Sequence, residues 1–393
     1  MIQDRNIVCI ASSWFDHPTS KHHVMRLLSQ HNHVIWVNFH ASRKPQLNRR
    51  DASLIWRRLA RVWDGPKRVA PEIDVLSPVL LPQPESQFAR GLNGRILARQ
   101  IRRALHGLPD RPTQLWLFTP DVPELIGRVP AECVVYYCVD DFAAFAGYNA
   151  KLVEQLERRT MAASDVVFTT SEQLYEGRKD RHPNVHLIQH GVDFEHFAGA
   201  VSLPEDAIPE DLKPIPRPIF GYMGLISEWV DLDVVGRAAR ARPEWSFVLL
   251  GEARCDLDAV ASLSNVHRLG GKPYEQLPTY CRGFDVGLIP FRMNRLIRAV
   301  NPIKLREYLA AGLPVVSSPM TEVLRYAPAV QTAQSPAEFI AACERALAIA
   351  GDGCGHLRQD LVRSESWASR VETMSEIIAR SVACAHAAAT AVS

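Results

Sequence analysis

The sequence predicts an α/β protein with two doubly wound domains, in which helices cover both faces of each parallel sheet. Short β-rich runs alternate with helical patterns along the chain, which is typical of parallel strands joined by crossover helices. A length of 393 residues exceeds the roughly 250–300 residues at which a single core stops growing, so we expect two cores. Hydrophobic residues make up 47% of the chain and charged residues 22%, which is typical of a globular protein that stays in water.

The first predicted domain spans residues 1–202. Helices are expected near His22–Gln30, Leu92–His106 and Leu152–Ala163, where apolar residues recur at helical spacing. Its expected strands are Ile7–Ala11, Val34–Phe39, Leu115–Phe118, Val134–Tyr137, Val166–Thr169 and Val185–Ile188.

A linker is predicted over residues 203–218, where the periodicity stops and five prolines appear. The second domain is expected over 219–360, with helices that begin after Asp231, Tyr274, Asn301 and Pro336. Its expected strands are Ile219–Met223, Phe247–Leu250, Val266–Leu269, Val286–Pro290 and Val315–Ser317.

A C-terminal helix is expected within 361–381, because Trp367, Val371, Met374 and Ile378 are spaced to share one face. Packing of this helix back on the N-terminal domain is one arrangement that we consider. The alanine-rich stretch 382–393 is predicted to be a frayed tail.

Apolar run lengths and cysteine spacing predict where the protein is located and whether it binds a metal. The apolar run Ile7–Ala11 is too short for a secretory signal, and no stretch approaches the roughly 18 apolar residues that cross a bilayer. We expect a cytoplasmic protein, and peripheral attachment to the inner face of the cytoplasmic membrane stays open. The eight cysteines lack the paired short spacings of a zinc site, so we expect reduced thiols and no metal.

The strongest local signal is the segment 301–316, NPIKLREYLAAGLPVV. Asn301 suits a helix N-cap and Pro302 the first helical position, while Gly312 suits the helix end. A helix N-terminus attracts anions, and Lys304 adds a full charge in its first turn. Glu307 shares a face with Lys304 and could accept hydrogen bonds from a sugar diol. The alternative is an ordinary Lys–Glu surface pair on a crossover helix.

These residues resemble the nucleotide-sugar glycosyltransferases of the B-type fold, and the NPxKxxEY form is similar to the bacterial polysaccharide branch, including teichuronic-acid-type transferases. The resemblance implies two Rossmann-like domains facing a cleft, the GT-B superfold. It also implies that Glu307 binds the ribose of a nucleotide-sugar donor. The same resemblance extends to His190-Gly191-Val192-Asp193, at the end of the N-terminal domain in many members. The donor residues expected from it are Gly224, Gly271, Lys272, Arg292, Asn301, Lys304 and Glu307.

One position departs from the family pattern. Retaining members usually carry a second Glu eight residues before the ribose-binding one, and this chain has Ala299 there. Whether transfer retains or inverts the anomeric configuration therefore stays open. Arg292, Arg295 and Arg298 could neutralise the donor diphosphate instead.

Asp140 is the candidate catalytic base. It follows the strand Val134–Tyr137, and ligands of open parallel sheets bind beyond the carboxyl ends of strands. Its position resembles that of the base in the xanthan glucuronosyltransferase, where a carboxylate would deprotonate the acceptor hydroxyl. The alternatives are that Asp140 or Asp141 caps a helix, or that Asp141 is the base. The loop 12–22 reaches the same sheet edge, and its Asp16 and His22 are the next candidates.

Two further segments carry charge. Asp231-Leu232-Asp233 has the form of a metal-binding motif, but we expect it to cap a helix. Nine basic residues crowd positions 43–68, which indicates an anionic partner. Within this block, residues 54–63 could form a basic helix with tryptophans that lies on an anionic membrane surface, or a helix that packs on its own domain. No nucleic-acid-binding module is recognised.

The predicted function is transfer of a sugar from a nucleotide-sugar donor to a hydroxyl of a cell-surface glycan or lipid-linked acceptor. The enzyme would be hexosyltransferase-like, with no metal and no cofactor besides the donor substrate. A base at Asp140 favours inversion. The alternatives are a non-catalytic module that binds a sugar nucleotide or glycan, and another GT-B enzyme such as a sugar-nucleotide epimerase.

Overall fold

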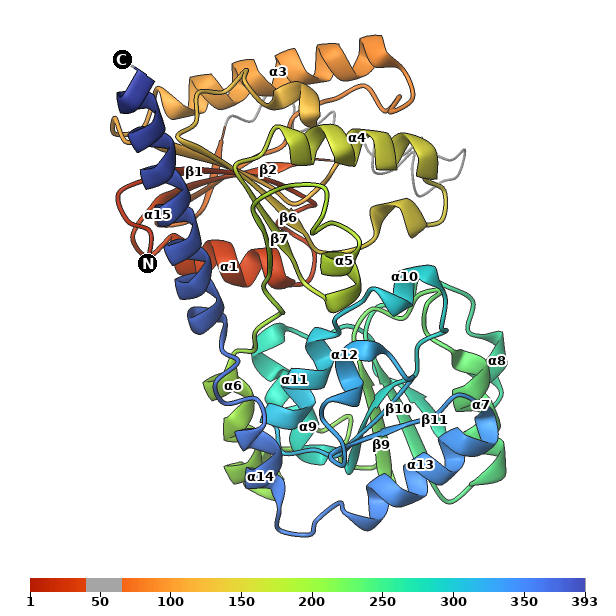
Figure 1. Ribbon diagram of the computed structural model, residues 1–393. Coiled ribbons are helices and arrows are strands. Elements are labelled where there is room, and N and C mark those ends of the chain that lie inside the picture. The colour runs from red at the N-terminus through yellow and green to blue at the C-terminus, as the bar shows by residue number, and fades with distance from the viewer. Residues whose placement is uncertain (40–65, 393) are drawn as a thin grey trace. The chain divides into compact units, whose positions relative to one another are not determined.

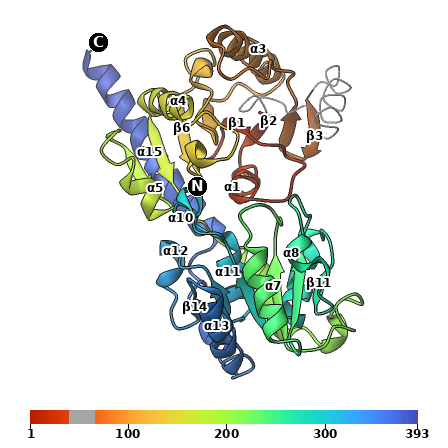
Figure 2. The same cartoon turned by 90° about the vertical axis from the view of Figure 1, so that its right-hand side faces the viewer.

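The computed structural model describes residues 1–39 and 66–392 and divides into two compact units. Unit 1 consists of Met1–Gln189 together with Arg370–Ser393, and unit 2 consists of His190–Ser369. Each unit contains one β-sheet with helices on both faces (Figures 1 and 2). This confirms the predicted α/β class with two doubly wound domains.

The sheet of unit 1 has eight strands in the order β3-β4-β2-β1-β5-β6-β7-β8. The strands are β1 (Asn6–Ala11), β2 (His33–Asn38), β3 (Lys67–Ala70), β4 (Ile73–Leu76), β5 (Thr113–Leu117), β6 (Cys133–Cys138), β7 (Val166–Thr169) and β8 (Val185–Leu187). All neighbours are parallel except β3 and β4. Every residue of β1, β2 and β6 is buried, which is why these strands read as continuous apolar runs.

The helices of unit 1 cover both faces of this sheet. They are α1 (Ser20–Leu28), α3 (Gln87–Leu105), α4 (Ala150–Ala162), α5 (Glu172–Glu176) and α15 (Trp367–Val392), of which the first three residues belong to unit 2. In Figure 1, α3 and α4 lie on one face and α1 on the other. Polar side chains cap the N-termini of α3, α4 and α5, because Ser86 accepts from the Ala89 N–H, Asn149 from the Leu152 N–H and Ser171 from the Leu174 N–H.

The β3–β4 pair was not predicted. The charged residues Lys67 and Arg68 hide the strand pattern of β3, and they are exposed in the folded chain. The Arg68 guanidinium pairs with Asp74 of β4 at 2.6 Å, so a cross-strand ion pair takes the place of apolar burial. The basic tryptophan-containing helix expected at residues 54–63 lies outside the described residues.

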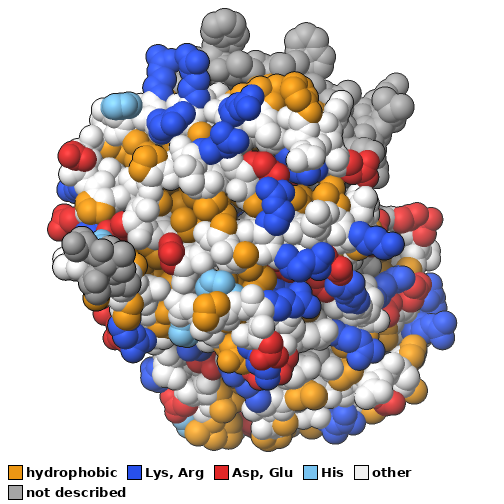
Figure 3. Space-filling view, turned by 45° about the horizontal axis from the view of Figure 1, so that its top comes forward, with side chains coloured by type: hydrophobic (Ala, Val, Ile, Leu, Met, Phe, Trp, Pro, Cys, Tyr) orange, Lys and Arg blue, Asp and Glu red, His pale blue; other side chains and the backbone are white. Residues whose placement is uncertain are grey.

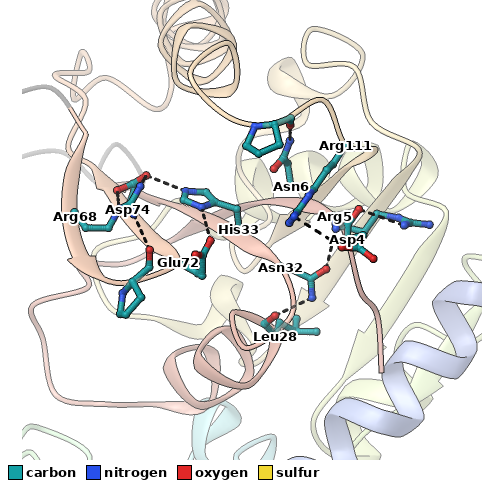
Figure 4. A network of polar contacts seen from close by, with 12 residues as sticks. Asp4, Arg5, Asn6, Leu28, Asn32, His33, Arg68, Glu72, Asp74 and Arg111 are labelled. Carbon is teal, nitrogen blue, oxygen red and sulfur yellow. Dashed lines mark hydrogen bonds and ion pairs between the residues drawn. The ribbon is translucent and has the colours of Figure 1, made fainter.

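A polar network lies around the start of β2, as Figure 4 shows. His33 contacts Glu72 through Nδ1 at 3.0 Å and Asp74 through Nε2 at 2.8 Å. Asn32 donates to the Leu28 carbonyl and accepts from the Arg5 N–H. This network ties the N-terminal ends of the strands together, so it belongs to the scaffold and lies at the end of the sheet opposite Asp140.

The C-terminal helix α15 packs on unit 1 from Arg370 onward. Val371, Met374 and Ile378 are buried, and the Ser381 hydroxyl accepts from the Asn184 amide at 2.9 Å. The helix continues to Val392, through the stretch predicted to be a frayed tail. Alanine has the highest helix propensity, which explains why this alanine-rich stretch is helical.

The sheet of unit 2 has six parallel strands in the order β11-β10-β9-β12-β13-β14. They are β9 (Ile219–Met223), β10 (Ser246–Leu250), β11 (Val266–Arg268), β12 (Val286–Ile289), β13 (Val315–Ser317) and β14 (Val330–Thr332). The helices are α6 (Phe194–Ala198), α7 (Leu232–Ala241), α8 (Asp258–Ala261), α9 (Leu277–Gly283), α10 (Arg295–Arg298), α11 (Ile303–Ala310), α12 (Thr321–Leu324), α13 (Pro336–Ala348) and α14 (Gly355–Asp360).

Alternate residues of β9 supply two cores, one on each face of this sheet. Ile219 and Met223 pack with α6, α9 and α11, whereas Phe220 and Tyr222 pack with α7 and α13. This alternation follows from the two-residue period of a strand. The helix α11 that carries the predicted donor residues is therefore held by a complete core beneath it.

The boundary between the units comes earlier than the predicted linker at 203–218. Leu212 and Ile215 are buried in the core of unit 2, so this proline-rich segment is part of that unit. The chain enters unit 2 at His190, the residue that opens the His-Gly-Val-Asp sequence. Two hydrogen bonds, from the Val192 N–H to the Glu365 carbonyl and from the Trp367 N–H to the Val192 carbonyl, join the entering and returning segments.

Within the described part of the chain, no helix combines the length and apolar character needed to cross a membrane. The same residues contain no group of three or more His, Cys, Asp or Glu side chains placed to hold a metal ion.

Candidate functional site

The helix α11 begins at Ile303, with Pro302 in the N-cap position. Asn301 therefore does not cap the helix, contrary to the prediction. Its amide oxygen accepts from Arg306 Nη1 at 2.6 Å, and its amide nitrogen donates to Glu322 at 3.4 Å. Arg306 is fully buried, and a buried guanidinium requires acceptors, so the Asn301 oxygen is used there. Asn301 shapes the start of α11 through Arg306.

Lys304 and Glu307 form an ion pair on α11, with 2.9 Å between Nζ and Oε2. The Glu307 side chain is only 3% exposed and the Lys304 side chain 26%. The pair predicted as the alternative therefore forms, but it is not an ordinary surface pair. Burial of the carboxylate leaves the ammonium as the more accessible member.

Gly224 brings the end of β9 against this pair. A Cβ atom added at Gly224 would lie 3.4 Å from Lys304 Cε, and its φ of +147° is rarely adopted by residues with a side chain. Gly251, at the end of β10, approaches the Gly224 carbonyl so closely that an added Cβ would lie 1.8 Å away. Backbone without side chains therefore lies beside Lys304. Gly251 was missed, although a glycine directly after the strand Phe247–Leu250 could have indicated it.

Tyr308 fixes α11 to the sheet and was also missed as a positioning residue. Its hydroxyl accepts from the Met223 N–H at 2.7 Å and donates to the Gly221 carbonyl at 3.2 Å. The ring lies on Gly287 of β12, where an added Cβ would be 2.6 Å from the ring. The tyrosine that follows Glu307 in the sequence, together with glycines in two neighbouring strands, was the available signal.

Two of the predicted donor cations are engaged by carboxylates. Lys272 pairs with Asp211 at 2.6 Å, and Arg292 pairs with Asp233 at 2.8 Å. Lys272 and Gly271 also follow β11, and β10 lies between β11 and β9. Of the predicted donor residues, the structure thus brings Gly224, Lys304 and Glu307 together most clearly.

Asp231 caps α7, as predicted, by accepting from the Val234 N–H at 3.3 Å. Its neighbour Asp233 holds Arg292. The Asp-Leu-Asp sequence therefore serves a helix start and an ion pair. Arg295 and Arg298 are exposed residues of α10, whose N-cap is Asn294.

Asp140 lies just beyond the carboxyl end of β6 and is half-buried. Within the described part of the chain, no group hydrogen-bonds its carboxylate. Burial raises the pKa of Asp140 to about 6, the Lys21 ammonium opposes this rise, and Asp141 adds to it. A carboxylate with this pKa can accept a proton near neutral pH.

Lys21, at the start of α1, is the charged neighbour that the sequence did not single out. Burial lowers its pKa, and the negative charges of Asp140 and Asp16 oppose that shift. Its position in the loop that follows β1 was the available signal, because the carboxyl ends of β1 and β6 lie on the same sheet edge.

The capping alternative for the aspartate pair has little support. Asp141 occupies the N-cap position of a short 3₁₀ helix, Phe142–Ala144, but makes no side-chain cap hydrogen bond. Asp140 precedes that position. The two carboxylates are thus not explained by helix capping.

His22, a reserve candidate for the base, is a scaffold residue. Its Nδ1 accepts from the Thr19 N–H at 3.1 Å, and its Nε2 contacts the Trp14 carbonyl at 3.2 Å. The ring also packs against Trp14 and Trp36. Burial lowers the pKa of His22 to about 3, so the ring is neutral with both nitrogens engaged. Asp16, the other reserve candidate, is exposed.

Residues 217–349, which contain α11 and the end of β9, match the family described as glycosyl transferases group 1. A relative from Bacillus subtilis (strain 168), provisionally named as a teichuronic acid biosynthesis glycosyltransferase, is 28% identical over 278 residues. That match covers 64% of this chain and 68% of the relative.

Solved structures share the fold over nearly the whole chain. The sucrose-phosphate synthase from Thermosynechococcus elongatus superposes with a TM-score of 0.67 at 14% identity, covering 97% of this chain and 100% of that one. The Anabaena protein HepE in complex with UDP and glucose gives a TM-score of 0.62 at 12% identity, covering 95% and 99%. The matched domain, the relative and the shared fold together support a GT-B glycosyltransferase related to those of bacterial polysaccharide synthesis.

Proposed function

We propose that this glycosyltransferase moves a sugar from a nucleotide-sugar donor to a hydroxyl of a cell-surface glycan or lipid-linked acceptor. The observation that supports the donor most directly is the Lys304–Glu307 pair beside Gly224, at the carboxyl end of β9. Open parallel sheets bind ligands at that edge. The proposal assigns the donor to unit 2 and the acceptor hydroxyl to unit 1.

Within the donor site, Lys304 stabilises the diphosphate on which negative charge develops as the sugar leaves. Glu307 accepts hydrogen bonds from the ribose hydroxyls, and the bare backbone at Gly224 admits the phosphates. Gly271 contributes backbone groups near the base. Lys272 and Arg292 can join only by exchanging Asp211 and Asp233 for phosphate oxygens. Asn301 acts indirectly, through Arg306.

At the acceptor, Asp140 takes the proton of the attacking hydroxyl. The oxygen of that hydroxyl bonds to the anomeric carbon while the bond from this carbon to the diphosphate oxygen breaks. The nucleoside diphosphate leaves with the electron pair, and the proton stays on Asp140. A base acting in one displacement favours inversion. The chain has Ala299 where a second Glu is usual in retaining members of the family, which is compatible with inversion.

We propose that transfer needs no metal ion, because Lys304 supplies positive charge at the diphosphate and Arg292 can add to it by exchanging Asp233 for a phosphate oxygen. Transfer should therefore continue in EDTA. Loss of transfer in EDTA that Mn²⁺ or Mg²⁺ restores would overturn this part of the proposal.

A thermal-shift screen against UDP, GDP, dTDP and CDP tests the donor class. A nucleotide at 100 times its dissociation constant should stabilise the protein by about 2.7 kcal/mol. UDP is the first choice, because the HepE structure contains UDP and an Escherichia coli trehalose-6-phosphate protein was solved with UDP-2-fluoro glucose. No shift with any of the four would contradict the proposal.

Product analysis then separates the alternatives. A transferase releases the nucleoside diphosphate from its sugar donor, and mass spectrometry detects this even when water replaces the acceptor. A binding module leaves the donor intact. An epimerase returns an isomer of unchanged mass, which chromatography separates. Nucleotide binding without cleavage, with or without acceptor extracts, would favour the binding module.

A further inference from the structure

The outer face of α3 carries a stripe of arginines that ends in an exposed phenylalanine. Phe88, Arg95, Arg99 and Arg102 are spaced by seven, four and three residues, so they share one face of a helix with 3.6 residues per turn. All four are exposed, and Phe88, at 78%, is the most exposed large hydrophobic side chain of the described residues. The opposite face buries Ala89, Asn93, Gly94, Leu97, Ala98 and Ile101.

Among the described residues, these arginines have no carboxylate partners. The helix contains no acidic residue, and no ion pair involves Arg95, Arg99, Arg102 or Arg103 among the residues that the structure describes. Arg90 differs, because it lies nearer the sheet and contacts Glu124 at 3.4 Å. In Figure 3, blue Lys and Arg side chains gather over α3 beside orange hydrophobic ones.

Phe88 is held in water at the start of this stripe. Val79 and Leu81, in the segment before α3, are 37% and 40% exposed, but Leu81 lies on the other side of the helix. The Asn93 side chain on that side binds Leu81 twice, accepting from its N–H at 2.8 Å and donating to its carbonyl at 2.9 Å. The arginine face therefore has one large exposed apolar group, Phe88, and among the described residues its arginines have no ion-pair partner.

We propose that this α3 face, defined by Phe88, Arg95, Arg99, Arg102 and Arg103, docks on an anionic lipid surface. Arginines would contact lipid phosphates, while Phe88 would enter the boundary between headgroups and acyl chains. A nucleic acid would also attract the arginines. A single strand stacks its successive bases on several aromatic rings, and this face has only Phe88, at one end, so the lipid surface is favoured.

This proposal gives a site to the peripheral membrane attachment that the sequence left open, and it uses described residues independent of positions 54–63. Sedimentation with vesicles tests it without donor or acceptor. A failure to bind vesicles therefore does not contradict the proposed transfer reaction, and a failed transfer assay does not contradict the proposed docking face.

The experiment compares vesicles of phosphatidylglycerol and phosphatidylcholine in equal parts with vesicles of phosphatidylcholine alone. Each arginine near an anionic surface contributes about a fivefold factor in affinity, so Arg99→Gln with Arg102→Gln should weaken binding roughly 25-fold. Arg237→Gln with Arg268→Gln makes the same charge change at exposed positions of unit 2, and should bind like wild type. Phe88→Ala should weaken binding about tenfold, and Phe88→Leu much less.

Equal partition of wild type and the Arg99/Arg102 variant into the mixed vesicles would overturn the proposal. An equal loss of vesicle binding in the Arg237/Arg268 control variant would also overturn it. So would binding of the protein to single-stranded RNA but not to vesicles, if Phe88→Ala leaves the RNA binding unchanged. Release by Trp56→Glu with Arg57→Glu, together with wild-type binding of the α3 variants, would assign attachment to the other segment. Unchanged melting temperatures verify folding, and Arg95→Gln with Arg103→Gln replaces any variant that fails this check.

Discussion

Asp140 has the properties expected of a general base, since its carboxylate is half-buried, accepts no hydrogen bond from the described residues and has a pKa of about 6. We expect Asp140→Asn to lower kcat by about 10²- to 10⁴-fold with little change in donor affinity. In wild type, kcat/KM should fall as the pH drops through about 6, because protonation removes the base. A pH–rate profile and nucleotide titration of both proteins measure this.

Stability provides the control for Asp140. The folded pKa of about 6 lies above the ordinary value of 3.8 for an aspartate, so ionisation of this carboxyl destabilises the fold progressively as the pH rises from 3.8 to about 6, and fully above that. Asp140→Asn removes this charge, and its melting temperature at pH 7 should equal or exceed that of wild type. If Asp141→Asn is inactive and Asp140→Asn is active, the base is Asp141. Full transfer activity in both variants would exclude Asp140 and Asp141 as the catalytic base.

Glu307 is expected to bind the ribose, and its replacement should be felt in nucleotide affinity. Glu307→Ala should weaken binding of the best nucleoside diphosphate by about 1.5–3 kcal/mol, because a charged acceptor is lost. Glu307→Gln keeps one acceptor oxygen and should lose less. Glu338→Ala, on a helix that packs on the opposite face of the sheet, is the matched control in calorimetry. Unchanged affinity in Glu307→Ala would remove this residue from the site.

Side chains whose partners are distant in sequence were the least predictable part of the site. The N-cap expected at Asn301 depends only on neighbouring residues, whereas the actual hydrogen bond depends on burial of Arg306. Lys272 pairs with Asp211, 61 residues away, which no local pattern could indicate. The Lys304–Glu307 pair was predictable, because a spacing of three residues on a helix fixes it.

Among the elements, α11 is hydrogen-bonded to β9 through the Tyr308 hydroxyl, in addition to its packing in the core. Tyr308→Phe leaves the buried Met223 N–H and Gly221 carbonyl without their partner, and we expect a loss of about 1–3 kcal/mol in the free energy of unfolding. Donor affinity should fall as well, because Lys304 and Glu307 are on the same helix. Urea denaturation and calorimetry measure the two effects.

Tyr136→Phe is the comparison for this variant. The Tyr136 hydroxyl is also buried and binds Glu157 in unit 1, at 2.7 Å. Its loss should lower stability without lowering nucleotide affinity. Equal affinity losses in both variants would mean that stability, and not the position of α11, controls donor binding.

The elements themselves were predicted well where burial determines them. β7, β9 and β13 have the predicted ends, because apolar runs between polar loops leave one choice. β3 was missed because its two charged residues face solvent, and its stability depends on pairing with β4. Edge strands of this kind have no hydrophobic pattern to detect.

At the scale of the whole molecule, unit 1 needs the C-terminal helix. Deletion of residues 370–393 removes Val371, Met374 and Ile378, each of which contributes about 1.5–3 kcal/mol by burial. Their sum is comparable to the whole stability of a domain, about 5–15 kcal/mol. In limited proteolysis, we expect unit 1 of the shortened protein to be degraded rapidly.

Deletion of residues 384–393 is the control, because it leaves the buried part of α15 and the Ser381–Asn184 bond in place. That protein should resist protease like wild type. A protein ending at Ser369 with an intact unit 1 would show that α15 merely covers a sheet that is stable without it.

The interrupted course of unit 1 also sets an order for folding on the ribosome. Unit 2 is one continuous segment, His190–Ser369, whereas unit 1 is completed only by residues that follow it. Domains usually fold in the order in which they are synthesised, from the N-terminus. Here unit 2 is complete once Ser369 has been synthesised, before unit 1 is complete. Until α15 has been translated, the sheet of unit 1 lacks this helix and part of its surface is uncovered. During translation, the first 189 residues are therefore the part of this chain most in need of a chaperone.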